Sequence, residues 1–360
     1  MSATPLRIVH VASGREWRGG QRQVLLLAAH LAQDAGLSQT VITTRGSPLE
    51  ERLRAAGVPV RAAGWRAGLS PGALWALMGE ARQAPSLLHA HDAHALTLAG
   101  AAGLLARRPL VVTRRVDFHL RRRGFWVRAA RVIAISEAVR RILLEDGVSP
   151  ERITVVHSGI DLDEVRATRP GAIRHELGLP SDPPLLVTVA ALVPHKDPAT
   201  AVTAAAELRD QGIAAVWAIA GAGPLRPLLE RRIGELSLRD RVHLLGHIPD
   251  PLRLIAAASA FVLTSVEEGL GTSVLDAMAL GVPVVATRAG GIPEILEQGA
   301  GLLVDPRNPF ALAAAVARVL SDPALGQDLI SRAARRVQQF SAGRMAEAVL
   351  QVYRSVVPGR

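Results

Sequence analysis

The 360-residue sequence contains no cysteine, few aromatic residues and a single lysine, Lys196, beside forty-one arginines. Without cysteine, disulfides and thiolate chemistry are excluded, which fits a reducing compartment. Aromatic residues amount to 3% of the chain and leave few rings to stack on nucleic acid bases. The uncharged apolar run 95–106 is too short to cross a bilayer, and no signal-peptide pattern opens the chain. We therefore expect a cytoplasmic protein without a nucleic-acid partner.

Positive charge is abundant and unevenly placed. The formal net charge is +10, and the stretch from 107 to 131 contains nine arginines but only one acid, Asp117. These arginines are Arg107, Arg108, Arg114, Arg115, Arg121, Arg122, Arg123, Arg128 and Arg131. One interpretation is a solvated basic face. The other is an anionic partner, either a phosphate-bearing substrate or an acidic membrane, which would attach the protein to the inner membrane face.

The first half of the chain alternates short β-branched runs with helical stretches. Strands are predicted at 7–12, 40–44, 58–62, 87–90, 110–113, 131–135 and 153–156. Helices are predicted at 21–35, 49–56, 71–84, 93–105 and 137–146. Strands that are apolar throughout and joined by helices indicate a parallel sheet covered on both faces.

The charged, proline-bearing stretch from 161 to 184 predicts a linker, and the alternation begins again at Leu185. Further strands are predicted at 216–220, 242–245, 260–264, 282–286 and 302–304, and helices at 200–211, 225–236, 251–257, 273–279, 293–298 and within 309–357. The fold class is therefore α/β, with two doubly wound sheets. We place one domain at 1–165, a second at 166–340, and a C-terminal helix at 341–360 that packs back on the first. Because such sheets bind ligands outside the carboxyl ends of their strands, we expect a cleft between the domains.

Lys196 stands where an anion would bind. It follows the apolar run 185–192 and precedes Asp197 and Pro198, which are typical of a helix N-cap and first helical residue. Free amides at a helix start also favour anions. An ammonium is a compact point charge and a guanidinium a broad fork, so a lone lysine among arginines indicates a narrow anion site. Chance survival of one lysine is the alternative.

The stretch from 265 to 296 combines donors for phosphate with acceptors for hydroxyl groups. Gly269 and Gly271 let the backbone approach a ligand, and a helix is predicted to begin near Thr272. The amides that would face the ligand belong to Leu270, Gly271, Thr272 and Ser273. Glu268 at the loop entrance and Asp276 one turn into the helix suit sugar hydroxyls better than phosphate. Taken singly, each acid could equally be a solvated surface residue.

At these positions the chain resembles the family 4 glycosyltransferases, retaining enzymes of the GT-B fold that use nucleotide-sugar donors. The family's two acids, separated by seven residues, fall on Glu268 and Asp276. The segment "WRGGQRQV" (17–24) resembles the family's glycine loop, and "AALVPHKDP" the stretch with its phosphate-binding lysine. The segments "AISEAVRRIL", "ITVVHSGID", "AGAGPLRPLLE" and "VHLLGHIPD" extend the resemblance along most of the chain.

The resemblance implies two Rossmann-like domains, the first binding the acceptor and the second the nucleotide sugar. It implies that Lys196 neutralises the donor diphosphate, that Asp276 binds the ribose and that Glu268 binds the transferred sugar. Further donor contacts are expected from Gly19, Gly20, Gly246, His247, Gly269, Leu270, Gly271, Thr272 and Ser273. Since the ammonium supplies the positive charge that the leaving diphosphate needs, no metal and no other cofactor are expected.

The sequence departs from the family pattern at four places. Ala191 stands where the family has an arginine, Asp276 is one methylene shorter than the usual glutamate, and Ser158 replaces an asparagine. Arg114 and Arg115 replace the usual histidine after the "VVT" strand. The diphosphate contact missing at 191 is either absent or supplied by Arg114, Arg115 or His195.

The motif "HAHDAHA" (89–95) offers potential metal ligands. His89 and His91 share one face of a strand, but His94 lies in the following helix and no acidic cluster is adjacent, so a metal site is not expected. His91 or His94 would instead edge the cleft and touch the sugar or acceptor, unless it is a core histidine. We place His91 with Lys196 and Glu268 in the catalytic set.

The leading hypothesis is a metal-independent, retaining transferase that moves a hexose-type sugar to a glycan or lipid-linked acceptor by front-face attack. Acceptor or membrane candidates are Trp17, His94, Arg114, Arg115, Arg121, Arg122, Arg123 and Trp126, whereas Trp65 and Trp75 are expected to pack. One alternative is a sugar-nucleotide epimerase or hydrolase of the same fold, which would release free sugar or isomerised donor. The other is an inactive donor-binding partner subunit, which would bind donor without turnover.

Overall fold

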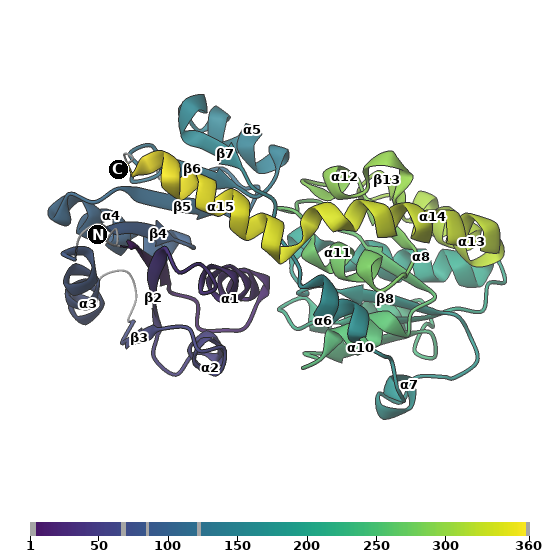
Figure 1. The fold of residues 1–360 in the computed structure, drawn as a ribbon. Coiled ribbons are helices and arrows are strands. Elements are labelled where there is room, and N and C mark those ends of the chain that lie inside the picture. Colours follow the sequence, from purple (N-terminus) through teal and green to yellow (C-terminus); the bar gives the residue numbers. More distant parts are fainter. Residues whose placement is uncertain (1–4, 66–69, 84–85, 121–123, 358–360) are drawn as a thin grey trace. The chain divides into compact units, whose positions relative to one another are not determined.

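The computed structural model describes residues 5–357 except 66–69, 84–85 and 121–123. The chain forms two compact units (Figure 1): unit 1 comprises Met1–Gly159 and Ser341–Arg360, and unit 2 comprises Ile160–Phe340. The first boundary lies six residues before the predicted one. The amide of Ile160 donates to the carbonyl of Phe340 at 2.9 Å, which ties the segment after Gly159 to unit 2.

Unit 1 contains a seven-stranded parallel sheet with the order β3-β2-β1-β4-β5-β6-β7. Its strands are β1 (Leu6–Ala12), β2 (Leu37–Thr44), β3 (Val60–Ala63), β4 (Ser86–Ala90), β5 (Leu110–Arg114), β6 (Arg131–Ala134) and β7 (Ile153–Val155). Its helices are α1 (Gly19–Leu31), α2 (Pro48–Ala55), α3 (Pro71–Ala81), α4 (Ala93–Ala106), α5 (Glu137–Glu145) and α15 (Ala342–Val356), with a 3₁₀ turn η1 (Pro150–Arg152). Every element predicted in the first half is present.

The last helix, α15, belongs to the core of unit 1. Its residues Met345, Val349 and Tyr353 are buried in one apolar cluster with Ile8 of β1 and Leu87 of β4. Apolar residues spaced three to four apart give the helix one buried face. The helix therefore covers the sheet of unit 1 although more than 180 residues separate it from the preceding element of that unit, β7.

Unit 2 contains a six-stranded parallel sheet with the order β10-β9-β8-β11-β12-β13. Its strands are β8 (Leu185–Val189), β9 (Val216–Ala220), β10 (Val242–Gly246), β11 (Ala260–Leu263), β12 (Val284–Thr287) and β13 (Leu302–Val304). Its helices are α6 (Leu162–Ala167), α7 (Ile173–Glu176), α8 (Pro198–Asp210), α9 (Arg226–Glu235), α10 (Pro251–Ala256), α11 (Thr272–Ala279), α12 (Ile292–Ile295), α13 (Pro309–Ser321) and α14 (Pro323–Arg336), with 3₁₀ turns η2 (Pro194–Lys196), η3 (Glu297–Gly299) and η4 (Val337–Phe340). Again the predicted strands and helices are present.

The prediction of a linker over 161–184 is wrong in one respect, because the segment folds onto unit 2. It forms α6 and α7, whose Val165 and Ile173 are buried. Arg253 of α10 pairs with Glu176 of α7 at 2.7 Å. The charged residues that suggested a linker cover the exposed faces of two short helices, while single apolar residues anchor them.

Each sheet reverses its strand order beside its first strand, so β1 lies next to β4 and β8 next to β11. Loops leave the carboxyl ends of two such strands toward opposite faces, and ligands of open α/β sheets bind at this place. The switch points therefore show where to look for a site in each unit. No helix of the described residues is long and apolar enough to cross a membrane.

Candidate functional site

The switch point of unit 2 joins the lysine and the first acid of the motif. Lys196 ends the 3₁₀ turn that follows β8, and Glu268 lies in the loop that follows β11. The Lys196 ammonium donates to Oε2 of Glu268. Their side chains are 18% and 14% exposed, so the interpretation of Glu268 as a solvated surface acid is excluded. The hydroxyl of Ser265 donates to the same carboxylate oxygen at 3.2 Å.

Backbone hydrogen bonds fix these two loops to each other. The Thr264 hydroxyl donates to the carbonyl of Lys196 at 2.9 Å, and the amide of Val266 donates to the carbonyl of His195 at 2.9 Å. The amide of Gly291 donates to the carbonyl of Glu268 at 3.0 Å. The charged pair is therefore held by a rigid frame, and its geometry does not depend on two flexible side chains alone.

Helix α11 begins at Thr272, as predicted, and its start faces the same loop. Gly271 precedes it with a φ of 92°, a conformation that favours glycine. A Cβ at Gly271 would lie 3.5 Å from Cγ of Glu268, so the backbone passes close to the acid. The first amides of a helix have no intrahelical acceptor and favour an anion. Asp276 in this helix is 6% exposed, so the alternative that it is a solvated surface residue is excluded.

The loops after β9 and β10 pack against the loop that carries Lys196. A Cβ at Gly221 would lie 1.8 Å from the carbonyl oxygen of Ala190, and one at Gly223 would lie 2.3 Å from that of Leu192. The amide of Gly221 donates to the carbonyl of Gly246 at 2.7 Å. Gly246 was predicted as a donor contact, and the segment "AGAGPLRPLLE" with Gly221 and Gly223 was part of the family resemblance, but these two glycines were not named as donor contacts.

Two positions beside these loops are exposed. One is His247, a predicted donor contact, and the other is Ala191, where the arginine typical of the family is missing. His195 is half-buried in the turn before Lys196. All the predicted donor residues of unit 2 thus lie in loops after β8, β10 and β11 or in the helix that follows β11, and their contact with a donor stays a prediction.

The switch point of unit 1 is arranged around Asp92. Its carboxylate accepts from the amide of Ser13 at 2.7 Å and also from the Ser13 hydroxyl, which fixes the loop after β1. It also caps α4 by accepting from the amides of His94 at 3.1 Å and Ala95 at 2.8 Å. Asp92 is therefore occupied by backbone donors. His94 is exposed in the first turn of α4.

Glycines open the other helix at this switch point. Gly19 and Gly20 are the first two residues of α1, so the predicted glycine loop does lead into a helix start. A Cβ at Gly20 would lie 3.7 Å from Cδ of Arg115, which runs alongside. The amides of this helix start suit an anion in the same way as those of α11.

Three buried histidines form a cluster under this switch point. His10 of β1 lies beside His89 of β4, and Nδ1 of His10 is 2.9 Å from Nε2 of His91. Both nitrogens of His89 are engaged, one with the Tyr353 hydroxyl at 2.6 Å and one with Thr113 Oγ1 at 2.7 Å. The three rings could bring ligand atoms within 4.8 Å of one another. The sequence analysis missed His10, although the segments "VHVA" and "LHAH" place alternate histidines on one face.

Electrostatics favour a neutral network over a bound cation. Desolvation lowers the pKa of His10 to about 4 and lowers the pKa values of His89 and His91 well below 6.5. Arg115, whose pKa burial lowers to about 10, places a guanidinium nitrogen 3.5 Å from Nδ1 of His91. That cation and the hydrogen bonds of His89 oppose a metal ion. His91 is 4% exposed and lies against Arg115, and its catalytic role stays a prediction.

The aromatic and arginine candidates of unit 1 divide into buried and exposed residues. Trp126 is 6% exposed and lies under the guanidinium of Arg114, 5.3 Å away, so the prediction that it stacks on an acceptor is wrong. Arg114 itself is buried and donates to the carbonyl of Phe118. Trp17 is half-buried, with Arg52 4.2 Å from its ring centre.

Two further expectations concern residues outside this switch point. Trp65 is buried, as predicted, whereas Trp75 was expected to pack and is 74% exposed. Arg121, Arg122 and Arg123 lie outside the described residues.

Comparison with known proteins agrees with this geometry. A family model described as Glycosyltransferase Family 4 matches residues 17–164, and one described as Glycosyl transferases group 1 matches residues 171–336. The D-inositol 3-phosphate glycosyltransferase of Kineococcus radiotolerans is 35% identical over 258 residues, which are 64% of this chain and 58% of that protein. The alpha-D-kanosaminyltransferase of Streptomyces kanamyceticus is 30% identical over 237 residues, which cover 64% of this chain and 61% of that protein. The matches thus span less than two thirds of these relatives.

Solved structures show the same fold. HepE of Anabaena in complex with UDP-glucose superposes with a TM-score of 0.86 at 23% identity, covering 97% of this chain and 99% of that one. A glycosyltransferase from Rickettsia africae gives a TM-score of 0.85 at 18% identity, with 99% and 100% covered. Two parallel-sheet α/β units that match these structures assign the GT-B fold. With both family models matched in chain order, the chain belongs to the family 4 glycosyltransferases.

Proposed function

We propose that this protein transfers a hexose-type sugar from a nucleotide-diphosphate sugar to a glycan or lipid-linked acceptor, with retention of configuration and without a metal ion. The observation that carries the proposal is the contact between Lys196 and Glu268 at the switch point of unit 2. A cation, a carboxylate and a helix start there form one small site that offers a partner to phosphate and to sugar hydroxyls.

The donor would exchange partners with the charged pair. Its diphosphate takes the ammonium of Lys196 and the first amides of α11, and Glu268 then accepts from sugar hydroxyl groups. Asp276, buried one turn into α11, would hold the ribose. The HepE structures with UDP and with UDP-glucose support a nucleotide sugar as the class of donor.

The reaction breaks the bond between the anomeric carbon and the diphosphate oxygen and forms a bond to the acceptor oxygen on the same face. The acceptor hydroxyl proton passes to the leaving phosphate oxygen. Negative charge grows on the diphosphate, and fixed donors aimed at such charge supply ~2.7–4 kcal/mol each. The ammonium of Lys196 is the protein's own source of positive charge at this place, which supports a reaction without a metal.

Unit 1 would bind the acceptor at the carboxyl edge of its sheet. His94 and Trp17 are accessible there, in the helix after β4 and the loop after β1. Arg115 lies beside the start of α1 and is the candidate for the diphosphate contact that Ala191 lacks. Gly19 and Gly20 would face the donor phosphates with their helix amides.

A donor panel read by thermal shift tests the proposal. Glucose, galactose and N-acetylglucosamine linked to UDP, GDP, ADP and TDP are compared with the free nucleoside diphosphates. We expect Lys196→Ala to lose the shift with all of them, and Glu268→Ala to lose only the extra shift that the sugar adds. The best donor is then incubated with and without glycan or lipid acceptors.

Three outcomes would overturn the transfer assignment. Isomerised donor or free sugar as the main product, with no acceptor glycosylated, would indicate an epimerase or hydrolase. Binding of a donor without turnover against every acceptor would indicate a donor-binding subunit. A shift that Lys196→Ala leaves unchanged would remove the diphosphate from this site.

A further inference from the structure

We infer that unit 1 docks on an anionic phospholipid membrane through a basic pocket at the amino edge of its sheet. This amino-edge pocket is bounded by the end of α4, the starts of β5 and β6, and η1. Its volume is about 660 Å³, and Arg107, Arg108, Arg128, Arg131 and Arg152 line it with Phe125. It lies at the opposite ends of the strands from Ser13 and Asp92, so the inference is independent of the transfer reaction.

The pocket collects positive charge that the described part of the protein does not neutralise. Five arginines line it against one acid, Glu151, which interacts electrostatically with Arg152 and Arg131. Three of them donate to carbonyl oxygens: Arg108 to Ala81 at 3.0 Å, Arg131 to Ala130 at 3.0 Å and Arg152 to Val127 at 2.7 Å. Arg107 and Arg128 are exposed. Gathering like charges costs energy that an anionic ligand recovers.

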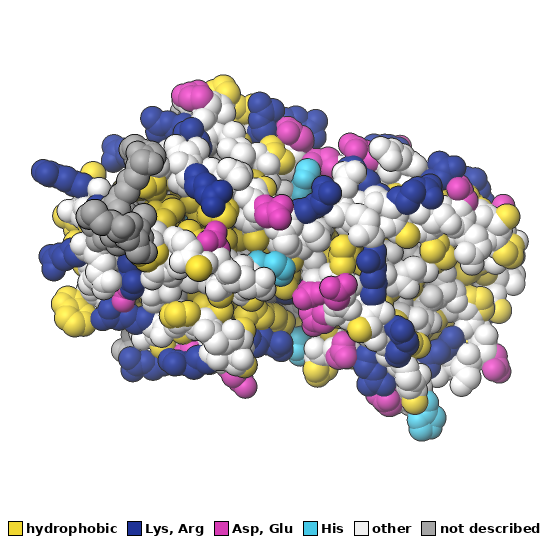
Figure 2. All heavy atoms as spheres, viewed as in Figure 1, with side chains coloured by type: hydrophobic (Ala, Val, Ile, Leu, Met, Phe, Trp, Pro, Cys, Tyr) yellow, Lys and Arg dark blue, Asp and Glu magenta, His cyan; other side chains and the backbone are white. Residues whose placement is uncertain are grey.

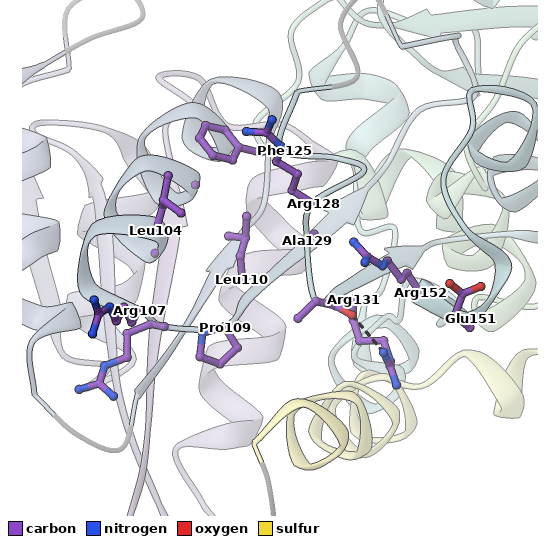
Figure 3. A pocket seen from close by; sticks show the side chains of 14 residues that line it. Leu104, Arg107, Pro109, Leu110, Phe125, Arg128, Ala129, Arg131, Glu151 and Arg152 are labelled. Atoms are coloured by element: carbon purple, nitrogen blue, oxygen red, sulfur yellow. Dashed lines mark hydrogen bonds between the residues drawn. The ribbon is translucent and has the colours of Figure 1, made fainter.

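Apolar side chains lie between and beside these arginines. Figure 3 shows Leu104, Pro109 and Leu110 between Arg107 on one side and Arg131 and Arg152 on the other. Leu104 and the neighbouring Leu105 are 71% and 67% exposed at the end of α4. Leu104 lines the pocket together with the arginines, and Leu105 follows it in the chain.

Further large apolar groups mark this part of unit 1. Trp75 is exposed on α3, the helix that packs beside α4, and Phe125 packs against α4 where Gly100 leaves room. A Cβ at Gly100 would lie 2.3 Å from the Phe125 ring. Figure 2 shows arginine side chains at several places on the surface of unit 1, with hydrophobic side chains among them.

This combination fits a membrane better than a soluble anion. Exposed leucine and tryptophan gain energy by entering the headgroup and acyl boundary, whereas arginine attracts anionic lipids. A free phosphate or phosphorylated sugar would use the guanidinium groups and leave the apolar side chains in water. The phosphate of a phospholipid in the pocket, with Leu104, Leu105 and Trp75 dipping beside it, uses both sets.

Arg107 adds a second argument. It ends α4 with a φ of 54°, the left-handed conformation in which helices commonly place glycine. An arginine at this position is less favourable for the backbone than glycine. Replacing it by glycine should therefore relieve the backbone and remove one of the charges, which separates docking from folding.

Co-sedimentation with vesicles tests the inference. We expect the protein to bind mixed phosphatidylcholine–phosphatidylglycerol vesicles, to bind pure phosphatidylcholine weakly, and to be released by salt. Arg107→Glu combined with Arg128→Glu should lower the partition coefficient about thirtyfold, equivalent to about 2 kcal/mol at 1.4 kcal/mol per tenfold. Arg107→Gly should weaken binding without lowering the melting temperature.

Matched variants separate a site from general charge. Arg54→Glu combined with Arg141→Glu makes the same change of charge on α2 and α5 and should leave at least most of the binding intact. Leu104→Gln should weaken the binding that persists at high salt. Donor hydrolysis in solution should stay normal in all these variants, so failure of docking and failure of the proposed reaction are distinguishable.

The inference is overturned if vesicles of both compositions bind equally, or if neither binds. It is also overturned if the control pair on α2 and α5 loses as much binding as the pocket pair. Salt-sensitive capture of an acidic protein, together with no vesicle binding, would assign the pocket to a protein partner instead.

Discussion

The two units share a strand plan but differ in charge. Unit 1 contains 25 arginines against 12 acids, a net charge of +13, whereas unit 2 contains 16 arginines and Lys196 against 20 acids, a net charge of −3. At the switch point of unit 1 the carboxylate of Asp92 accepts hydrogen bonds from backbone amides. At that of unit 2 a carboxylate and an ammonium face each other.

The two switch points have the same place in the sheet but different side chains, so the strand order determines where a site lies and a few loop residues determine its chemistry. In unit 1 the switch point rests on buried neutral histidines and one buried arginine. In unit 2 the start of α11 lies beside the loop of Glu268, which pairs with Lys196, so a cation and helix amides are available to an anion. Substitutions can therefore be chosen that change the activity or stability of one unit and leave the other unit unchanged.

The largest effect is expected at the charged pair of unit 2. Lys196→Ala and Glu268→Ala should each lower turnover about a hundredfold or more, equivalent to ~2.7–4 kcal/mol of transition-state stabilisation. Steady-state kinetics with the best donor measures it. Glu176→Ala, which breaks the exposed pair with Arg253 in the same unit, is the control and should keep its activity. Near-normal turnover of either site variant would remove that residue from the mechanism.

A steric change should unfold unit 2 selectively. In Gly221→Ala the new methyl group would lie 1.8 Å from the Ala190 carbonyl oxygen, and overpacking of this kind costs about 3 kcal/mol. Urea unfolding followed by hydrogen exchange should show loss in unit 2 while β1 and β4 stay protected. Gly212→Ala, also at a positive φ of 75° but with open space around it, should cost only about 1 kcal/mol. Equal costs would contradict the steric explanation.

Acid should weaken unit 1 before unit 2. The folded pKa of His10 is about 4, below its ordinary 6.5, so the unfolded chain binds the proton first and stability falls as the pH drops from 6.5 toward 4. From about pH 8 to about pH 5, His10 alone should cost roughly 2 kcal/mol. Burial also lowers the pKa values of the neighbouring His89 and His91, so these rings lower stability in acid in the same direction. Arg115 and Tyr353, the other groups around His10, do not change protonation state in this pH range.

Urea unfolding at several pH values checks this expectation. His10→Gln should flatten the acid slope, because it removes a group that must stay neutral. His94→Gln, an exchange of an exposed histidine, should leave the slope as it is. A slope that His10→Gln does not change would place the acid sensitivity elsewhere.

The smallest effect is expected from restoring the family's arginine. Ala191→Arg places a second cation in the exposed loop before Lys196 and should tighten donor binding by about 1 kcal/mol, roughly fivefold in Kd. Isothermal titration with the best donor measures it. Ala191→Gln adds similar length without charge and serves as the control. Unchanged or weaker donor binding in Ala191→Arg would contradict the expectation that position 191 faces the donor diphosphate.

The strands and the loop residues at their ends could be predicted from the sequence alone. Parallel strands buried on both faces are apolar throughout, as in "VWAIA" of β9, so both sheets could be predicted. The loop position of Lys196 and the helix start at Thr272 follow from adjacency to such strands. The pairing of Lys196 with Glu268, 72 residues apart, could not be predicted, because it depends on β8 lying beside β11.

The same limit explains the residues that sequence misjudged. The arginines from 107 to 131 form one cluster along the chain, but β5 separates them in space: Arg107 precedes the strand, and Arg114 and Arg115 end or follow it. His10 and His89 meet only because β1 pairs with β4. Contacts between neighbouring strands need the strand order, which local patterns do not contain.

Unit 2 is a continuous segment whose two ends meet. Within unit 2, the amide of Ile160 donates a hydrogen bond to the carbonyl of Phe340. Within unit 1, Gly159 lies against Ala342, and a Cβ added at Gly159 would lie 2.7 Å from the Cα of Ala342. Unit 2 is thus inserted into unit 1, and the chain passes between the two units at 159–160 and at 340–341, two points that lie close together. Cutting the chain at 159–160 and 340–341 should therefore release unit 2 as one continuous segment, and a segment from a relative could be inserted at the same two points.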